Sequence, residues 1–192
     1  MRIVGGRLRG LKLAEVGPGD PAAHLRPTTD RVREAIFNLV ENSHGVRLDG
    51  LRVLDLFAGT GALGLEALSR GAARVAFVDD GAPARALLRA NVEKARAMGV
   101  TDVWRRDATN LGPNRGAGYD VAFLDPPYGR RLGEAALASA LAGGWLSPGA
   151  LVVWEEDSAP LPPPGLIQID QRRYGGTLVT LLRVPEPAEA DV

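Results

Sequence analysis

Short apolar runs that alternate with helical patterns occupy the chain from Leu51 onward. Strands are expected at 51–57, 73–78, 100–106, 119–124 and 150–154, and helices at 62–70, 83–98 and 132–142. This alternation indicates a parallel sheet with helices on both faces. Segments 166–169 and 178–183 flank a Tyr-Gly-Gly turn and predict an antiparallel hairpin. We therefore expect an α/β fold with a doubly wound, mostly parallel seven-stranded sheet that ends in a C-terminal hairpin.

The first 44 residues predict a small extension in front of this sheet. Residues 2–13 alternate around a Gly-Gly pair and suggest a β-hairpin. One of the residues at 28–30 can cap the following helix, in which Val32, Ile36, Leu39 and Val40 form an apolar face. We therefore divide the chain into a hairpin-and-helix extension (1–44), a main domain (45–184) and a flexible acidic tail (185–192).

A glycine-rich loop follows the first strand of the main domain. Gly59, Gly61 and Gly64 fit the pattern GxGxxG at a strand-to-helix turn, where glycines allow a ligand and the helix to approach the backbone. Asp79 ends the next strand, 20 residues after Gly59, in a position to accept hydrogen bonds from ribose hydroxyls. The pattern predicts a Rossmann-like fold that binds a nucleoside-containing cofactor. NAD and S-adenosylmethionine both fit the glycines.

Two further acidic residues favour S-adenosylmethionine. Asp55 lies just inside the loop, where a carboxylate can face the ammonium group of a methionine moiety but would repel a pyrophosphate. Asp107 ends the third strand and can accept a hydrogen bond from an adenine amino group. For Asp55 the alternative is a structural role as the partner of a helix N-terminal dipole.

The tetrapeptide Asp125-Pro126-Pro127-Tyr128 follows the fourth strand. Ligands of open α/β sheets bind beyond the carboxyl ends of the strands, so this motif should lie beside the glycine loop. Prolines lack N–H groups and have a fixed φ, which leaves the Pro126 carbonyl free and rigidly aimed. Asp125 and this carbonyl provide two acceptors for the two hydrogens of an exocyclic amine, and Tyr128 offers a face on which a base can stack. The carboxylate would also balance the charge that develops on the amine nitrogen during methyl transfer.

These features coincide with longer motifs at 2–10, 25–37, 54–70, 125–128 and 145–155. Together they resemble the RsmD-type enzymes, class I S-adenosylmethionine-dependent methyltransferases that modify a guanine N2 in bacterial 16S ribosomal RNA. The resemblance covers about residues 1–183. It implies that the target guanine is held by Asp125, Pro126, Pro127 and Tyr128. It also implies cofactor contacts from Asp55, Phe57, Ala58, Gly59, Thr60, Gly61, Asp79, Asp107 and Ala108. Asp79 stands where such enzymes often carry Glu, and its shorter side chain would loosen contact with the ribose.

The net charge of zero, from 23 basic and 23 acidic residues, conceals a gradient. Residues 1–33 carry a charge of +4 and residues 155–192 a charge of −4. A basic excess is typical of nucleic-acid contact, so we expect the front segment to dock RNA. The candidate RNA-binding residues are Arg7, Arg9, Arg26, Arg31 and Arg33. The resemblance implies that the partner is 16S ribosomal RNA in the assembled small subunit.

Composition removes several classes of function. The absence of cysteine excludes disulfides, thiolate nucleophiles and Cys-ligated zinc, and the two histidines lack metal-ligand spacing, so no metal is expected. The sequence contains no apolar run of membrane-spanning length and no signal-peptide core, and we expect a cytoplasmic monomer without a membrane partner.

Four alternatives stay open from the sequence. An adenine-N6 methyltransferase on DNA or RNA would use the same Asp-Pro-Pro-Tyr motif. A protein-glutamine methyltransferase typically presents Asn in place of Asp125 and is disfavoured. An NAD-dependent oxidoreductase would explain the glycines and Asp79, yet it would give residues 125–128 no role. A non-catalytic RNA-binding module would need neither motif.

Overall fold

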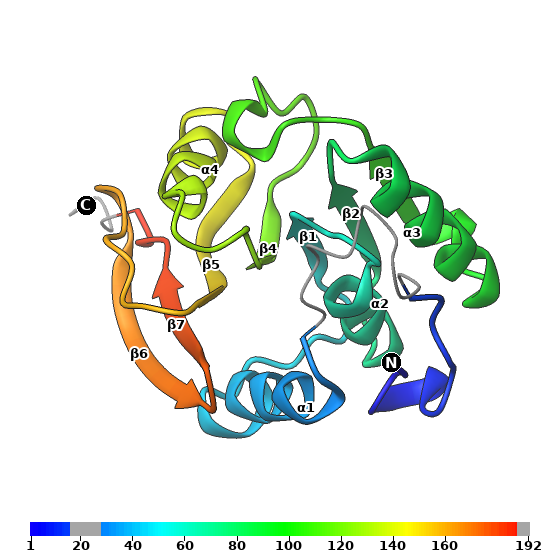
Figure 1. Cartoon of the computed structure of the whole chain (residues 1–192). Helices are drawn as coiled ribbons and strands as arrows, with labels where there is room; N and C mark the ends of the chain where they lie inside the picture. Colours follow the sequence, from blue (N-terminus) through cyan, green and yellow to red (C-terminus); the bar gives the residue numbers. More distant parts are fainter. Residues whose placement is uncertain (16–27, 188–192) are drawn as a thin grey trace.

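A seven-stranded sheet in the order β3-β2-β1-β4-β5-β7-β6 forms the centre of the computed structural model (Figure 1). The structure describes residues 1–15 and 28–187. The strands are β1 (Arg52–Leu56), β2 (Arg74–Val78), β3 (Thr101–Trp104), β4 (Tyr119–Leu124), β5 (Leu146–Glu156), β6 (Ile167–Tyr174) and β7 (Thr177–Arg183). The α-helices are α1 (Asp30–Asn38), α2 (Ala62–Ser69), α3 (Ala82–Lys94) and α4 (Leu132–Ala142). Shorter helical turns are η1 (Gly6–Leu8), η2 (Leu39–Ser43), η3 (Met98–Val100) and η4 (Ala108–Asn110).

The pairing of the strands confirms the expected mostly parallel sheet with an antiparallel C-terminal hairpin. Strands β3, β2, β1, β4 and β5 run parallel to one another, whereas β7 is antiparallel to both β5 and β6. The direction of strand order reverses between β1 and β4. In open α/β sheets, the carboxyl ends of the strands at such a switch point form the ligand crevice. The segments that follow β1 and β4 are therefore the ones placed to meet a ligand.

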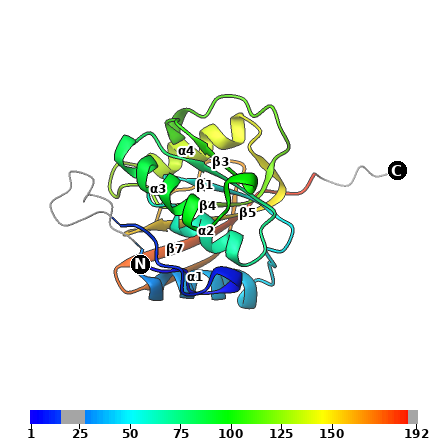
Figure 2. The ribbon, with the colours of Figure 1, turned by 90° about the vertical axis from the view of Figure 1, so that its right-hand side faces the viewer.

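Each strand places alternate side chains in two separate apolar layers. Val53 and Phe123 belong to the layer that contains side chains of α1, α2 and α3, which we call the α1 face of the sheet. Leu54 and Leu124 belong to the opposite layer, which contains side chains of α4. The helices consequently cover both faces of the sheet, as Figures 1 and 2 show.

The N-terminal segment folds back on itself, but its hairpin is reduced to one β-bridge between Arg2 and Lys12. Three backbone hydrogen bonds join its two arms, from Ile3 to Leu11, from Gly10 to Ile3 and from Leu13 to Met1, and further backbone N–H groups donate to α2. The N–H groups of Val4 and Gly5 donate to the Glu66 carboxylate over 2.8 and 2.7 Å. This packing places the N-terminus beside α2 in Figure 1.

Helix α1 begins where its sequence indicates, because the Thr29 hydroxyl accepts a hydrogen bond from the Val32 N–H over 3.2 Å. The predicted apolar face is confirmed: Ile36, Leu39 and Val40 are buried in the core, and the half-buried Val32 packs against it. The buried face is wider than predicted, because it also includes Arg33 and Phe37. Phe37 packs against Phe123 on β4 with ring centroids 5.2 Å apart.

Within the described part of the chain, no helix has both the length and the apolar character that crossing a bilayer requires.

Candidate active site

The loop between β1 and α2 has an unusual backbone. Phe57, Gly59 and Gly61 have φ values of +57°, +54° and +79°. A positive φ is costly for a bulky residue such as Phe57, and strained residues of this kind cluster at functional sites. A Cβ at Gly61 would lie 2.3 Å from Leu88 Cδ1, so both backbone conformation and space require glycine there.

Two buried acids hold this loop in place. An Asp55 oxygen accepts a hydrogen bond from the Gly64 N–H over 2.9 Å, so Asp55 has the helix-partner role that the sequence left as an alternative. Asp79 accepts from the N–H groups of Gly59 and Gly81, each over 2.8 Å, and ties the loop to the end of β2. Burial raises the pKa of Asp79, and it raises the pKa of Asp55 well above the usual range with help from the Asp125 and Asp79 charges.

Asp107 and Ala108 lie at the start of η4. One Asp107 oxygen accepts from the backbone N–H and the hydroxyl of Thr109 over 2.8 and 2.7 Å, and the Asp107 side chain is exposed while Ala108 is buried. The acidic groups fit S-adenosylmethionine chemically: Asp79 and Asp107 offer carboxyl oxygens as acceptors for hydroxyl and amino groups, and the positive charge of an ammonium beside Asp55 would favour the ionised form that burial disfavours. Among the described residues, no cluster of His, Asp or Glu is arranged to hold a metal ion.

Asp125 lies next to a second carboxylate that the sequence analysis did not place in the site. The parallel register pairs Leu124 with Trp154, so the following residues, Asp125 and Glu155, are neighbours across β4 and β5. The Thr28 Oγ1 atom lies 3.2 Å from Asp125 Oδ2, 3.2 Å from Glu155 Oε2 and 3.3 Å from Glu155 Oε1. We call Thr28, Asp125 and Glu155 the acidic triad. Side chains alternate between the two faces along a strand, so Asp125 and Glu155 lie on the same face as Phe123 and Val153, which is the α1 face of the sheet.

Burial dominates the electrostatics of the triad. It raises the pKa of Asp125 to about 7; the Thr28 hydrogen bond opposes this rise and the Glu156 charge adds to it. The Glu155 side chain is only 1% exposed, and burial raises its pKa well above the usual range, with further contributions from the Asp125 and Asp55 charges. Arg33 partly offsets the rise for Glu155. Asp125 can therefore change charge near neutral pH.

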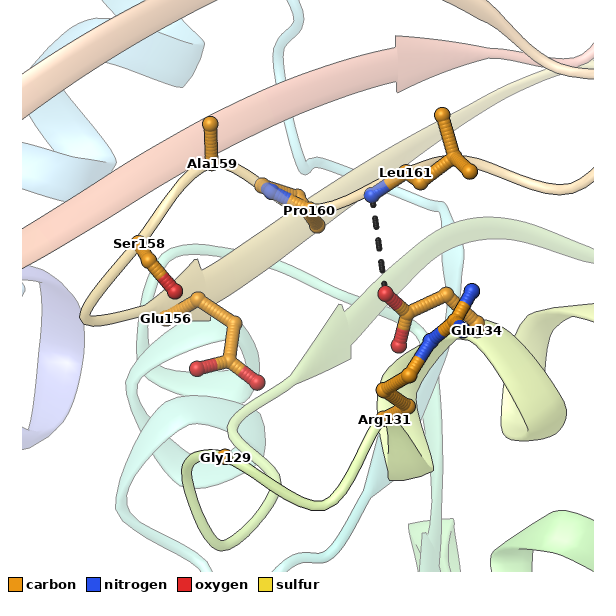
Figure 3. Close-up of a pocket in the computed structure, with 8 residues that line it drawn as sticks. All are labelled: Gly129, Arg131, Glu134, Glu156, Ser158, Ala159, Pro160 and Leu161. Carbon is orange, nitrogen blue, oxygen red and sulfur yellow. Dashed lines mark hydrogen bonds between the residues drawn. The ribbon is translucent and has the colours of Figure 1, made fainter.

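The other three residues of the Asp-Pro-Pro-Tyr motif differ in their exposure to solvent. Pro126 is buried, Pro127 is exposed and Tyr128 is half-buried, with a pKa raised by burial and by the Asp125 charge. No donor among the described residues reaches the Pro126 carbonyl, which leaves it open as an acceptor. The motif leads into a pocket of about 280 Å³ lined by residues that include Gly129, where Figure 3 shows the Glu134 and Glu156 carboxylates.

The candidate RNA-binding arginines divide into two groups. Arg7, Arg9 and Arg31 are exposed. Arg33 has no exposed surface, and the expectation that it docks RNA is wrong. Its guanidinium donates to the carbonyl of Thr28 over 3.2 Å, to Asp30 over 2.9 Å and to the carbonyl of Arg2. Arg26 lies outside the described residues.

Comparison with known proteins places the chain in a family. The profile of the family described as "Conserved hypothetical protein 95" matches residues 1–183. The chain belongs to this family. Members of known name include the ribosomal RNA small subunit methyltransferase D of Escherichia coli K12, which is 39% identical over 158 residues and covers 82% of this chain and 75% of its own length. The enzyme of the same name from Haemophilus influenzae is 35% identical over 169 residues, 85% of this chain and 83% of its own length.

Solved structures agree with this membership. The structure of yhhF from Escherichia coli superposes with a TM-score of 0.82 at 30% identity and covers 97% of this chain and 99% of its own. An RNA methyltransferase from Salinibacter ruber, solved with S-adenosyl-L-homocysteine, has a TM-score of 0.60 at 18% identity and covers 86% of this chain and 97% of its own. At that identity the similarity shows the fold alone.

Sequence reasoning missed Thr28 and Glu155 as parts of the site. Thr28 lies in the motif 25–37 and is one of three candidate caps for the following helix, a role that belongs to Thr29. Glu155 ends one of the motifs that carried the family resemblance, but its neighbour across the sheet depends on a strand pairing that no local pattern specifies. The available signal was weak: an acid near the carboxyl end of a buried strand.

Proposed function

We propose that the protein transfers a methyl group from S-adenosylmethionine to the exocyclic N2 amine of a guanine in 16S ribosomal RNA, in the assembled small subunit. The observation that carries the proposal is the position of Asp125 and the open Pro126 carbonyl at the switch point of the sheet, next to the strained glycine loop. The names of two relatives in the same family support ribosomal RNA as the substrate. Such a substrate would locate the reaction in the cytoplasm.

The residues of the site have separate tasks in this reaction. When bound, S-adenosylmethionine supplies a methyl group on a positively charged sulfur, which becomes a neutral thioether once the amine nitrogen has taken the methyl. The Asp125 carboxylate and the Pro126 carbonyl accept the two amine hydrogens and orient the nitrogen. Asp125 stabilises the positive charge that develops on nitrogen and then accepts the proton that the methylated nitrogen loses. Tyr128 stacks on the base.

The exposed arginines Arg7, Arg9 and Arg31 form the proposed RNA-docking surface. Changing all three to Glu should weaken binding to small subunits and flatten the dependence of affinity on salt, because fewer counterions are released on binding. The matched control changes Arg89, Lys94 and Arg115, three exposed basic residues elsewhere in the chain, to Glu and so alters the net charge equally. An unchanged salt slope in the triple variant would locate the docking surface elsewhere.

The decisive experiment is transfer of labelled methyl from S-adenosylmethionine into unmodified small subunits, followed by nucleoside analysis. We expect N2-methylguanosine with the wild-type protein and no product with Asp125→Ala, although Asp125→Ala should bind S-adenosylhomocysteine with little change. Asp102→Ala, which removes an acid from a surface ion pair with Arg74, should remain active. Turnover by Asp125→Ala would refute the amine-orienting role.

Two other outcomes identify the alternatives. N6-methyladenosine as the labelled product would move the assignment to an adenine methyltransferase. Calorimetry with S-adenosylhomocysteine and NADH in parallel separates the cofactors, and tight binding of NADH alone would favour an oxidoreductase.

A further inference from the structure

The acidic triad places two carboxylates on one hydroxyl group. Thr28 Oγ1 is within 3.3 Å of oxygens from both Asp125 and Glu155. A hydroxyl has a single proton and can donate to one carboxylate at a time, while its lone pairs can accept from a second donor. With both carboxylates ionised, one of them would direct its lone pairs at the lone pairs of Thr28. With one carboxyl protonated, every group in the triad has a partner.

The burial of the two acids decides which of them carries the proton. Glu155 is 1% exposed and its hydrogen-bond partner among the described residues is Thr28, whereas Asp125 retains partial exposure at the carboxyl end of β4. A fully buried carboxylate with one shared donor is costly to ionise. The arrangement of lowest energy is a chain in which the Glu155 O–H donates to the Thr28 oxygen and the Thr28 O–H donates to the Asp125 carboxylate.

The groups around the triad carry too little positive charge to stabilise both carboxylates in their ionised forms. The charged and titratable groups around the triad are Arg33 and Asp30 on α1, Asp55 on β1, Glu66 on α2, Asp79 after β2, Tyr128 after β4 and Glu156 on β5. Strand β7 places the apolar Val179 opposite Glu155. Arg33 is the cation of this group, and it already pairs with Asp30 at 2.9 Å and approaches Glu66 to 3.7 Å. Negative charge therefore exceeds positive charge around the triad.

We propose that Glu155 and Thr28 are positioning residues for Asp125, and that one proton held along the chain Glu155–Thr28–Asp125 keeps Asp125 ionised and oriented toward the substrate amine. The inference rests on the proposed function, in which Asp125 is the group that touches the amine. The two positioning residues act through Asp125 and do not contact the substrate. Loss of the Thr28 hydrogen bond should therefore change the pH at which Asp125 becomes competent.

The two substitutions should have different effects. Glu155→Gln is a neutral mimic of the protonated Glu155 and keeps a donor to the Thr28 oxygen, so the pH at which Asp125 ionises should change little. Thr28→Val keeps the shape but removes the hydrogen bond that favours the ionised form, so Asp125 should ionise at higher pH. Thr28→Ser retains the hydroxyl and should keep the wild-type behaviour. A merely structural role would lower activity without moving the pH profile of Thr28→Val.

The test is kcat/KM for small subunits at pH 6 divided by its value at pH 8.5, with S-adenosylmethionine saturating. This ratio cancels differences in the amount of active protein. If Asp125 titrates at about 7, the wild-type ratio should be about one tenth. We expect this ratio to stay within about twofold of the wild-type value in Glu155→Gln and Thr28→Ser, and to fall at least threefold in Thr28→Val. A threefold rise in Glu155→Gln would show that Glu155 is ionised and would overturn the shared proton. Asp102→Asn, far from the triad, should leave the ratio unchanged.

A direct titration covers variants that are too slow to assay. In protein labelled with ¹³C at the aspartate carboxyl, the Asp125 resonance is the one missing from Asp125→Ala. Its midpoint in the S-adenosylhomocysteine complex should stay near the wild-type value in Glu155→Gln and rise in Thr28→Val. An unchanged midpoint in Thr28→Val or a lowered midpoint in Glu155→Gln, with Asp125→Ala inactive, would overturn the shared proton and leave the proposed function intact. Turnover by Asp125→Ala would instead overturn the proposed function.

Discussion

The raised pKa of Asp125 predicts a cost in stability that can be measured without any substrate. Its pKa is about 7 in the folded protein, against an ordinary value of 3.8. The folded state therefore holds a proton that the unfolded state loses, and the stability present at low pH declines as pH rises toward 7. The interval from pH 5 to pH 7 lies between the pKa values of the unfolded and folded states and spans two pH units. Over it the free energy of unfolding should fall by about 3 kcal/mol. Because Asp125 is partly exposed and titrates together with Glu155, we expect between about 1 and 3 kcal/mol.

Asp125→Asn removes the titrating group while keeping its size. In urea unfolding at pH 5, 6, 7 and 8, the free energy of unfolding of the wild-type protein should fall relative to that of Asp125→Asn as pH rises, by about 1 to 3 kcal/mol over the series. Asp102→Asn is the control, since Asp102 lies in a surface ion pair with Arg74 and should run parallel to the wild type across this range. Parallel curves for wild type and Asp125→Asn would refute the burial argument.

Two further substitutions have matched controls. Gly61→Ala should cost at least about 2 kcal/mol and weaken S-adenosylhomocysteine binding, because it adds a clash with Leu88 to backbone strain. Gly50→Ala has nearly the same φ, +77° against +79°, and open space around it, so it should cost about 1 kcal/mol and leave calorimetric binding unchanged. Arg33→Met should lower the free energy of unfolding by about 3 to 5 kcal/mol because it leaves buried acceptors unpaired. Arg31→Met, at the exposed neighbouring position, should stay within about 0.5 kcal/mol; equal losses would contradict the burial of Arg33.

The strands were predictable because buried parallel strands are continuous apolar runs, as in Val75–Val78 and Val121–Leu124. The exact residues at which helices and strands begin and end were less predictable. Helix α3 stops at Lys94 instead of the expected 98, because Arg96 adopts a φ of +52° that no helix continues. Strand β5 starts at Leu146, four residues early, because an irregular register lets Leu146 pair with Tyr119.

The site was predictable where neighbouring residues carry it and unpredictable where the sheet assembles it. The glycine loop and the motif 125–128 are local, and the rule for switch points brings them to the same edge. Glu155 meets Asp125 through a strand pairing, and Thr28 meets both through the packing of α1. Arg33 was misassigned because a buried arginine with several hydrogen-bond partners has the same sequence signature as a solvated one.

The burial of Arg33 gives the N-terminal segment a structural connection to the site. Arg33 bonds the carbonyls of Arg2 and Thr28, and Thr28 bonds the Asp125 carboxylate. Glu66, which approaches Arg33, also holds the backbone of Val4. The front of the chain is thus connected through buried polar groups to the group that would orient the amine. Loss of the Arg33 side chain should therefore disturb the position of Thr28, and with it that of Asp125, as well as the stability of the fold.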